Sequence, residues 1–213
     1  MDIYIDCTNG ISTDMVLNAL IDLGADEKII EEQINALGDL PHHRGYKDIK
    51  KMLETSSADE EVKKKALLVY GAIARAEAEV HGETLDTVHF HEVGRDEAIR
   101  NIVSVAAALK VLGVDKIYCS EIHDGHGTIK CSHGIIPVPV PAVTALKKQC
   151  DHVFCEDDIN TEMVTPGGLA LLIGIGAVKS DPPKKIIKTG VGKGTRDIGR
   201  DGLKIHSIGC CKN

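Results

Sequence analysis

Hydrophobic residues recur along this chain at two spacings, every three to four positions in some segments and every second position in others. The first spacing is typical of a helix with one buried face, and the second of a strand. Helices are predicted at residues 15–23, 27–37, 96–112, 142–148 and 167–175, with a longer one from a capping region at 56–59 to residue 81. Strands are predicted at residues 3–5, 116–122, 127–131, 135–138, 185–189 and 203–208.

Strands and helices alternate over most of this length. Alternation of this kind favours an α/β fold with a mixed, partly parallel sheet and flanking helices. The runs 127–131 and 135–138 surround a Ser-His-Gly turn, which predicts a hairpin. We expect a single domain over residues 1–213, with a sub-boundary near residues 114–140.

The composition indicates a globular protein and argues against several partners. Of the 213 residues, 43% are hydrophobic and 27% are charged, which is enough apolar material for a packed core. A net charge of −7, no Trp, two Phe and four Tyr argue against nucleic-acid binding. We find no secretion signal and no apolar run of membrane-spanning length, so we expect a cytoplasmic protein without a membrane partner. The seven cysteines are then expected to be reduced thiols.

Candidate metal chemistry is concentrated at residues 88–94, which read Val-His-Phe-His-Glu-Val-Gly. If this segment is extended, His89 and His91 point to one face and Phe90 to the other. Neutral imidazoles suit nickel, zinc or copper, but two of them form only half of a metal site. The structural alternative is a pair of hydrogen-bonded histidines before a helix, with Glu92 complementing the helix start.

Two further segments carry candidate ligands. Asp6 and Asp14 border a polar loop after the first strand and could hold a hard cation, although Asp14 also favours the start of a helix without any ligand. The run Gly-Val-Gly-Lys-Gly-Thr at 190–195 lacks the spacing of a phosphate-binding loop, so a glycine-rich turn between strands is the simpler interpretation. Lys193 and Arg196 could still bind an anion.

Five strings occur in an order that resembles one known family. They are residues 6–15 (DCTNGISTDM), 76–82 (AEAEVHG), 88–94 (VHFHEVG), 130–142 (KCSHGIIPVPVPA) and 162–168 (EMVTPGG). Together they resemble the LarC family of nickel-insertion proteins, which mature the lactate racemase cofactor. The resemblance covers nearly all of this chain but only the N-terminal part of a full-length family member.

The resemblance implies a function in nickel insertion. Family members place Ni(II) into pyridinium-3,5-bisthiocarboxylic acid mononucleotide in a reaction that needs CTP. The nucleotide-binding part is attributed to a C-terminal domain that this chain lacks. We therefore expect a nickel chelatase-type (lyase) subunit that is inactive alone and needs a separately encoded C-terminal partner, with CTP and Mg or Mn bound there. A homo-oligomer is also expected.

The resemblance also implies site residues. The first metal candidates are His89, His91, Glu92 and His133. A second group of metal or ligand candidates comprises Asp6, Asp14, Glu97, His42 and His43. Lys130, Lys193 and Arg196 are candidates for binding the phosphate of the mononucleotide, a role that no motif assigns to them.

Departures from the family pattern keep two other functions open. Asn101 stands where the family has an aspartate, and the often His-rich stretch is reduced here to residues 41–44. A nickel-binding metallochaperone and a diverged, non-catalytic paralogue are therefore alternatives to the insertion subunit. Metal content separates the paralogue from the other two, and CTP turnover separates a complete enzyme from a subunit.

Overall fold

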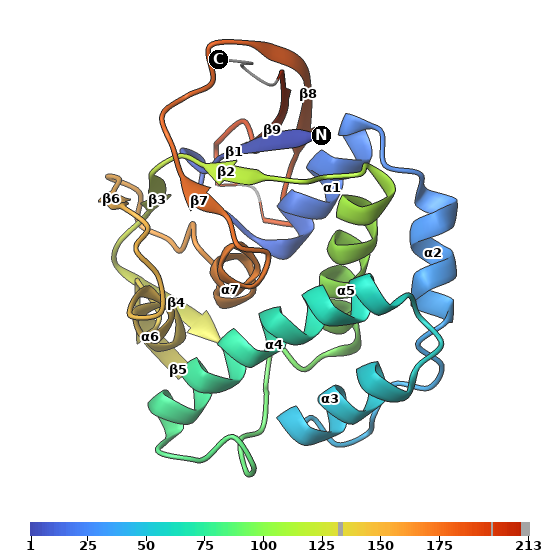
Figure 1. The fold of residues 1–213 in the computed structure, drawn as a ribbon. Coiled ribbons are helices and arrows are strands. Elements are labelled where there is room, and N and C mark those ends of the chain that lie inside the picture. The colour runs from blue at the N-terminus through green and yellow to red at the C-terminus, as the bar shows by residue number, and fades with distance from the viewer. Residues whose placement is uncertain (132–133, 197, 210–213) are drawn as a thin grey trace.

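The computed structural model describes residues 1–131, 134–196 and 198–209 (Figure 1). The helices are α1 (Thr13–Leu23), α2 (Glu27–Asn35), α3 (Tyr46–Thr55), α4 (Glu60–His81), α5 (Asp96–Val111), α6 (Pro141–Lys147) and α7 (Pro166–Gly174). The strands are β1 (Asp2–Asp6), β2 (Ile117–Cys119), β3 (Ile122–Asp124), β4 (Thr128–Cys131), β5 (Gly134–Pro137), β6 (Phe154–Glu156), β7 (Val178–Lys179), β8 (Ile186–Gly192) and β9 (Leu203–Ile208).

The main sheet has the order β7-β2-β1-β9-β8. Strands β1 and β2 run parallel, as do β2 and β7, whereas β9 is antiparallel to both β1 and β8. Ile3, Tyr4 and Ile5 are all buried, because β1 lies at the centre of the sheet and both of its faces are covered. The predicted mixed, partly parallel α/β fold is therefore confirmed.

Helix α1 packs directly against the backbone of β8, and glycines make this approach possible. A Cβ at Gly190 would lie 2.1 Å from the carbonyl oxygen of Ala19, and one at Gly192 would lie 1.9 Å from that of Met15. Both distances are far below contact, so only glycine fits at these positions. The prediction of a glycine-rich turn at 190–195 is thus wrong for these two residues, which lie inside β8.

The remaining core is formed by helices. Helix α4 contacts α5, α6 and α7, and α7 also contacts α1 (Figure 1). Close packing of α4 on α7 again depends on glycine, since a Cβ at Gly174 would lie 2.6 Å from the Cα of Val69. Helix α4 ends at Gly82, whose φ of 66° is the left-handed conformation expected of a C-terminal glycine cap.

Several predicted elements differ from the structure. The predicted strand 116–122 is divided into β2 and β3, which belong to different sheets. The predicted extended segment at 88–94 is reduced to a bridge between His89 and Gly45, because the chain turns at Glu92 before α5 begins. Helix α3 was not predicted, and it lacks the usual sequence signal because its N-cap, Gly45, makes no side-chain hydrogen bond.

The predicted hairpin is confirmed as β4 and β5, and the last two predicted strands as β8 and β9. Strands β3 and β6 form a separate parallel pair. None of the helices in the described ranges combines the length and the apolar character needed to cross a membrane.

Candidate functional site

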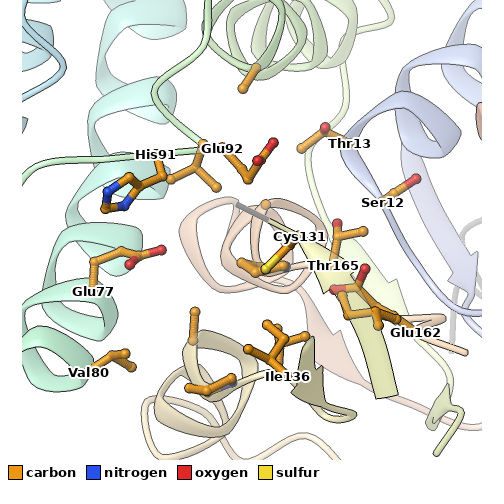
Figure 2. A pocket seen from close by; sticks show the side chains of 18 of the residues that line it. Ser12, Thr13, Glu77, Val80, His91, Glu92, Cys131, Ile136, Glu162 and Thr165 are labelled. Atoms are coloured by element: carbon orange, nitrogen blue, oxygen red, sulfur yellow. The ribbon is translucent and has the colours of Figure 1, made fainter. Parts of the chain in front are cut away.

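A pocket of about 700 Å³ opens among the helices and the β4–β5 hairpin. Its walls come from the C-terminal end of α4, the segment after Phe90, the hairpin, and the N-terminal ends of α1, α6 and α7. Figure 2 shows Glu77, Val80 and His91 on one side of the pocket, with Ser12, Glu162 and Thr165 across from them. Its volume lies in the range of cavities that bind small organic ligands.

One wall carries two imidazoles and two carboxylates. Glu77 and His81 are four residues apart on α4, which places them on the same helix face, and His81 Nε2 lies 3.3 Å from Glu77 Oε2. The ring of His91 approaches the same histidine, with 5.7 Å between the ring centroids. Glu92 also lines the pocket and forms an ion pair with Arg95 at 2.8 Å. Nitrogen and oxygen donors are thus gathered on this wall.

The opposite wall is built from two helix N-termini held together by the backbone. Ile11 donates to the carbonyl oxygen of Met163 at 2.9 Å, and Thr165 donates to that of Ile11 at 3.0 Å. Ser12 caps α1 and Thr165 caps α7 through their side-chain oxygens. Both helix starts therefore face the pocket, and their unpaired N–H groups favour negative charge there.

A buried carboxylate, that of Glu162, lies on this second wall. Glu162 is 7% exposed and forms an ion pair with Arg196 at 2.7 Å. Burial raises the pKa of Glu162, the Arg196 charge opposes this, and the nearby Asp124 carboxylate adds to the rise. The side chain of Asp124 in turn accepts hydrogen bonds from the backbone of Met163 and Val164, both at 3.1 Å. Asp124 therefore holds the segment that carries Glu162.

Asp14 lines the pocket but is occupied by hydrogen bonds. Its carboxylate accepts from the backbone N–H of Thr195 at 2.9 Å, from the Thr195 hydroxyl at 3.2 Å and from the Ser12 hydroxyl. Burial acts to raise the pKa of Asp14, but the hydrogen bonds from Ser12 and Thr195 outweigh it and lower the pKa. These contacts support a structural role, in which Asp14 fastens the segment after β8 to the start of α1.

The structure brings some of the predicted site residues together and separates others. The pocket is lined by His91, Glu92, Asp14, Lys130 and Arg196. The predicted residues that are not among its lining are His89, Asp6, Glu97, His42, His43 and Lys193. His133 lies outside the described residues.

The predicted residues outside the pocket have identifiable surroundings. His89 is exposed and bridges to Gly45, and Asp6 accepts from the backbone and hydroxyl of Thr8. Glu97, His42 and His43 are exposed. Lys193 lines a smaller pocket of about 190 Å³ together with Arg196 and Arg200.

Four donors in the pocket were not predicted: Glu77, His81, Cys131 and Glu162. The spacing of Glu77 and His81 on a predicted helix was a usable signal, because side chains four positions apart share a face. Asn101, where the resemblance led us to expect an aspartate, does not line the pocket, whereas its neighbours Ala98 and Ile102 do. Asn101 therefore contributes no donor to the pocket wall.

A family model described as nickel insertion protein matches residues 3–41 and 39–205. The chain belongs to the nickel insertion protein family. This confirms the resemblance to LarC proteins that the five sequence strings indicated.

Curated relatives carry the name pyridinium-3,5-bisthiocarboxylic acid mononucleotide nickel insertion protein. The relative from Acetivibrio thermocellus is 37% identical, and the match covers 93% of this chain and 58% of the relative. The relative from Staphylococcus epidermidis is 34% identical over 92% of this chain and 56% of its own length. That from Akkermansia muciniphila is 35% identical over 95% and 57%.

This member of the nickel insertion family thus spans little more than half the length of the curated relatives that it matches. No solved structure matches it.

Proposed function

We propose that this chain is the metal-handling component of a nickel-insertion system. The system places Ni(II) into pyridinium-3,5-bisthiocarboxylic acid mononucleotide, the compound in the names of its relatives. The observation that carries the proposal is the pocket of about 700 Å³, in which His91 and Glu92 of the family-like segment meet donors from α4.

The ligand atoms that line this pocket suit a metal ion that is bound and then passed on. Glu77, His81 and His91 supply nitrogen and oxygen, and Cys131 adds sulfur across the pocket. Among the described residues of the pocket, no three such donor atoms lie within 4.8 Å of one another. We propose that the organic substrate completes the coordination, since nickel accepts imidazole, carboxylate and sulfur ligands.

The transfer step is a ligand exchange. Imidazole and carboxylate groups hold Ni(II) weakly enough to release it, and the two thiocarboxylate sulfurs of the substrate then displace them. Softer sulfur donors in a chelating arrangement favour this direction. The protein contributes position and metal selection, and any proton on the thiocarboxylate sulfurs leaves to solvent as the metal binds.

The other side of the pocket supports binding of the mononucleotide phosphate. Lys130 and Arg196 both line the pocket, and the start of α7 lies on the same wall as Arg196's partner Glu162. Arginine and lysine bind phosphate through charge-assisted hydrogen bonds, and a helix N-terminus adds a favourable dipole. We propose that Lys193, in the adjoining smaller pocket, extends this basic surface.

The dependence on CTP is proposed to lie elsewhere. The match covers 56–58% of the curated relatives, and we propose that a separately encoded partner equivalent to the remainder binds CTP with Mg or Mn. This chain would then act as a homo-oligomeric, cytoplasmic subunit of a chelatase. We expect no CTP turnover by the purified chain, measured as release of inorganic phosphate or pyrophosphate.

A nickel titration followed by calorimetry tests the proposal. His91→Ala removes an imidazole that lines the pocket, and His89→Ala is a matched control, because His89 is the same residue type two positions away, exposed and outside the lining. We expect His91→Ala to weaken one nickel site by at least about tenfold, as losing even an indirect contributor to a metal site does. His89→Ala should leave that site unchanged.

Three results would count against this assignment. If every saturable nickel site keeps its stoichiometry and affinity in His91→Ala, the pocket histidine is not a ligand. Loss of binding in His89→Ala with retention in His91→Ala would move the metal to the outer side of this segment. Absence of saturable binding to the unmodified protein would favour the diverged paralogue.

A further inference from the structure

Three side chains of types that can bind a metal lie at the short parallel pair β3 and β6, outside the pocket lining. His123 and Cys155 are direct partners in the register of these strands. Glu121 precedes His123 by two positions, the spacing that places side chains on one face of extended backbone. One ligand atom from each of Glu121, His123 and Cys155 lies within 4.8 Å of the other two.

The imidazole of this group is already oriented. His123 Nδ1 lies 2.7 Å from Asp157 Oδ1, and the other oxygen of Asp157 is paired with Arg200 at 2.6 Å. A carboxylate on one ring nitrogen fixes the tautomer and leaves Nε2 for a metal, the arrangement found behind many metal-bound histidines. Side-chain exposures of 26% for His123 and 17% for Asp157 leave the ring reachable but supported.

The third donor is a thiol held beside a carboxylate. Cys155 Sγ lies 3.3 Å from Glu121 Oε2, so the thiol proton occupies the space between sulfur and oxygen. A divalent cation can take the place of this proton, which leaves to solvent as the thiolate forms. The metal ion then balances the negative charges of the Cys155 thiolate and the Glu121 carboxylate.

We propose that Glu121, His123 and Cys155 form a binding site for a borderline divalent transition-metal ion, such as zinc or nickel. One sulfur, one nitrogen and one oxygen ligand suit such ions, whereas Mg²⁺ and Ca²⁺ prefer oxygen alone. Three protein ligands leave a position for solvent or an exchanging ligand. Asp157 is the positioning residue of this site.

This inference does not rest on the proposed function. None of the three ligands lines the pocket that contains His91. A nickel titration therefore separates the two sites: Cys155→Ser should remove this one, and His91→Ala should weaken the other. Either assignment can fail while the other stands.

Cobalt(II) titration of the full chain under reducing conditions is the test, because a cobalt–thiolate bond absorbs in the near ultraviolet. We expect Cys155→Ser to abolish the absorption of one cobalt equivalent, and His123→Ala to weaken its binding by at least about tenfold. Zinc and nickel should compete the cobalt away, and magnesium should not. Cys150→Ser is the matched control, because Cys150 is a half-buried thiol outside this group that donates to the carbonyl oxygens of Leu146 and Lys147 at the end of α6.

Two more variants test the role of Asp157 and the contribution of the C-terminal cysteines. Asp157→Asn should lower cobalt affinity by about tenfold to a hundredfold while the wavelength of the absorption is unchanged, since the ligand atoms remain. A merely structural Asp157 would leave the affinity intact. The adjacent Cys210 and Cys211 could also bind cobalt, so the double variant Cys210→Ser/Cys211→Ser should retain the signal. Loss of the signal there, with retention in Cys155→Ser, would overturn the proposal.

Discussion

Replacement of Asp124 by alanine should destabilise the protein through one small group of backbone atoms. Asp124 is 2% exposed, and its Oδ1 accepts hydrogen bonds from the backbone N–H groups of Gly125, Met163 and Val164 at 2.9, 3.1 and 3.1 Å. These contacts join β3 to the segment that places Glu162 in the pocket. Asp124→Ala leaves these donors buried without their acceptor.

The size of the effect follows from those three donors. A buried donor that loses its partner costs about 1–3 kcal/mol, which gives a gross loss of about 3–9 kcal/mol. Two effects reduce this loss. The segment can relax toward water, which hydrates the freed N–H groups. The substitution also removes the cost of burying a carboxylate, whose Oδ2 has no hydrogen-bond partner among the described residues. We expect a net loss of about 3–5 kcal/mol.

Urea unfolding monitored by circular dichroism would measure this loss. Asp124→Asn is the control, because its amide oxygen can still accept from the same N–H groups, and we expect it to cost at most about 2 kcal/mol. It should also lower the pKa of Glu162, since one of the groups that raise that pKa is removed. An Asp124→Ala variant within about 1 kcal/mol of the unmodified protein would refute the reasoning.

Two further predictions concern Glu162 and the glycines. Burial raises the pKa of Glu162 above the ordinary 4.5, so the folded state binds the proton more tightly than the unfolded state does. The free energy of unfolding of the unmodified protein, relative to that of Glu162→Gln, should therefore fall as pH rises from 4.5 through the folded pKa. Above the folded pKa this difference should stay constant. Paired urea titrations across this range check it, and a difference that is flat or rising with pH would contradict it. Gly192→Ala should cost about 3 kcal/mol, because its Cβ would lie 1.9 Å from the Met15 carbonyl oxygen and α1 would have to move. Thermal unfolding measures this cost, and Gly71→Ala is the control. Gly71 lies in the middle of α4, and its added Cβ would lie 3.5 Å from the nearest atom, so we expect a gain in stability of about 0.5–1 kcal/mol. Equal effects of the two substitutions would disprove the packing argument.

The sequence by itself determined the elements whose signals are local. The long helix α4 has capping residues at its start, apolar residues at helical spacing and Gly82 at its end. The hairpin β4–β5 and the final strands also follow from alternation and turn residues. These predictions succeeded because propensity, periodicity and capping act between residues that are close in the chain.

Elements that depend on distant partners were not predicted correctly. Residues 190–192 resemble a glycine-rich turn, yet they pair with β9 and form the end of β8, where α1 packs against their backbone. Helix α3 buries only Ile49 and Leu53 and has no side-chain cap, so its signal was weak. The segment around His89 was too short to continue as a strand, since it pairs with the chain only near Gly45.

The candidate sites show the same division. The sequence indicated His91, Glu92, Lys130 and Arg196 as functional, but it could not place them around one pocket or exclude His89 from the pocket lining. The group Glu121, His123 and Cys155 depends on strand pairing across more than thirty residues, which leaves no local pattern. The sequence determines which side chains can bind a metal or an anion. Long-range packing decides which of them meet, because only the folded backbone brings residues that are distant in the chain close together.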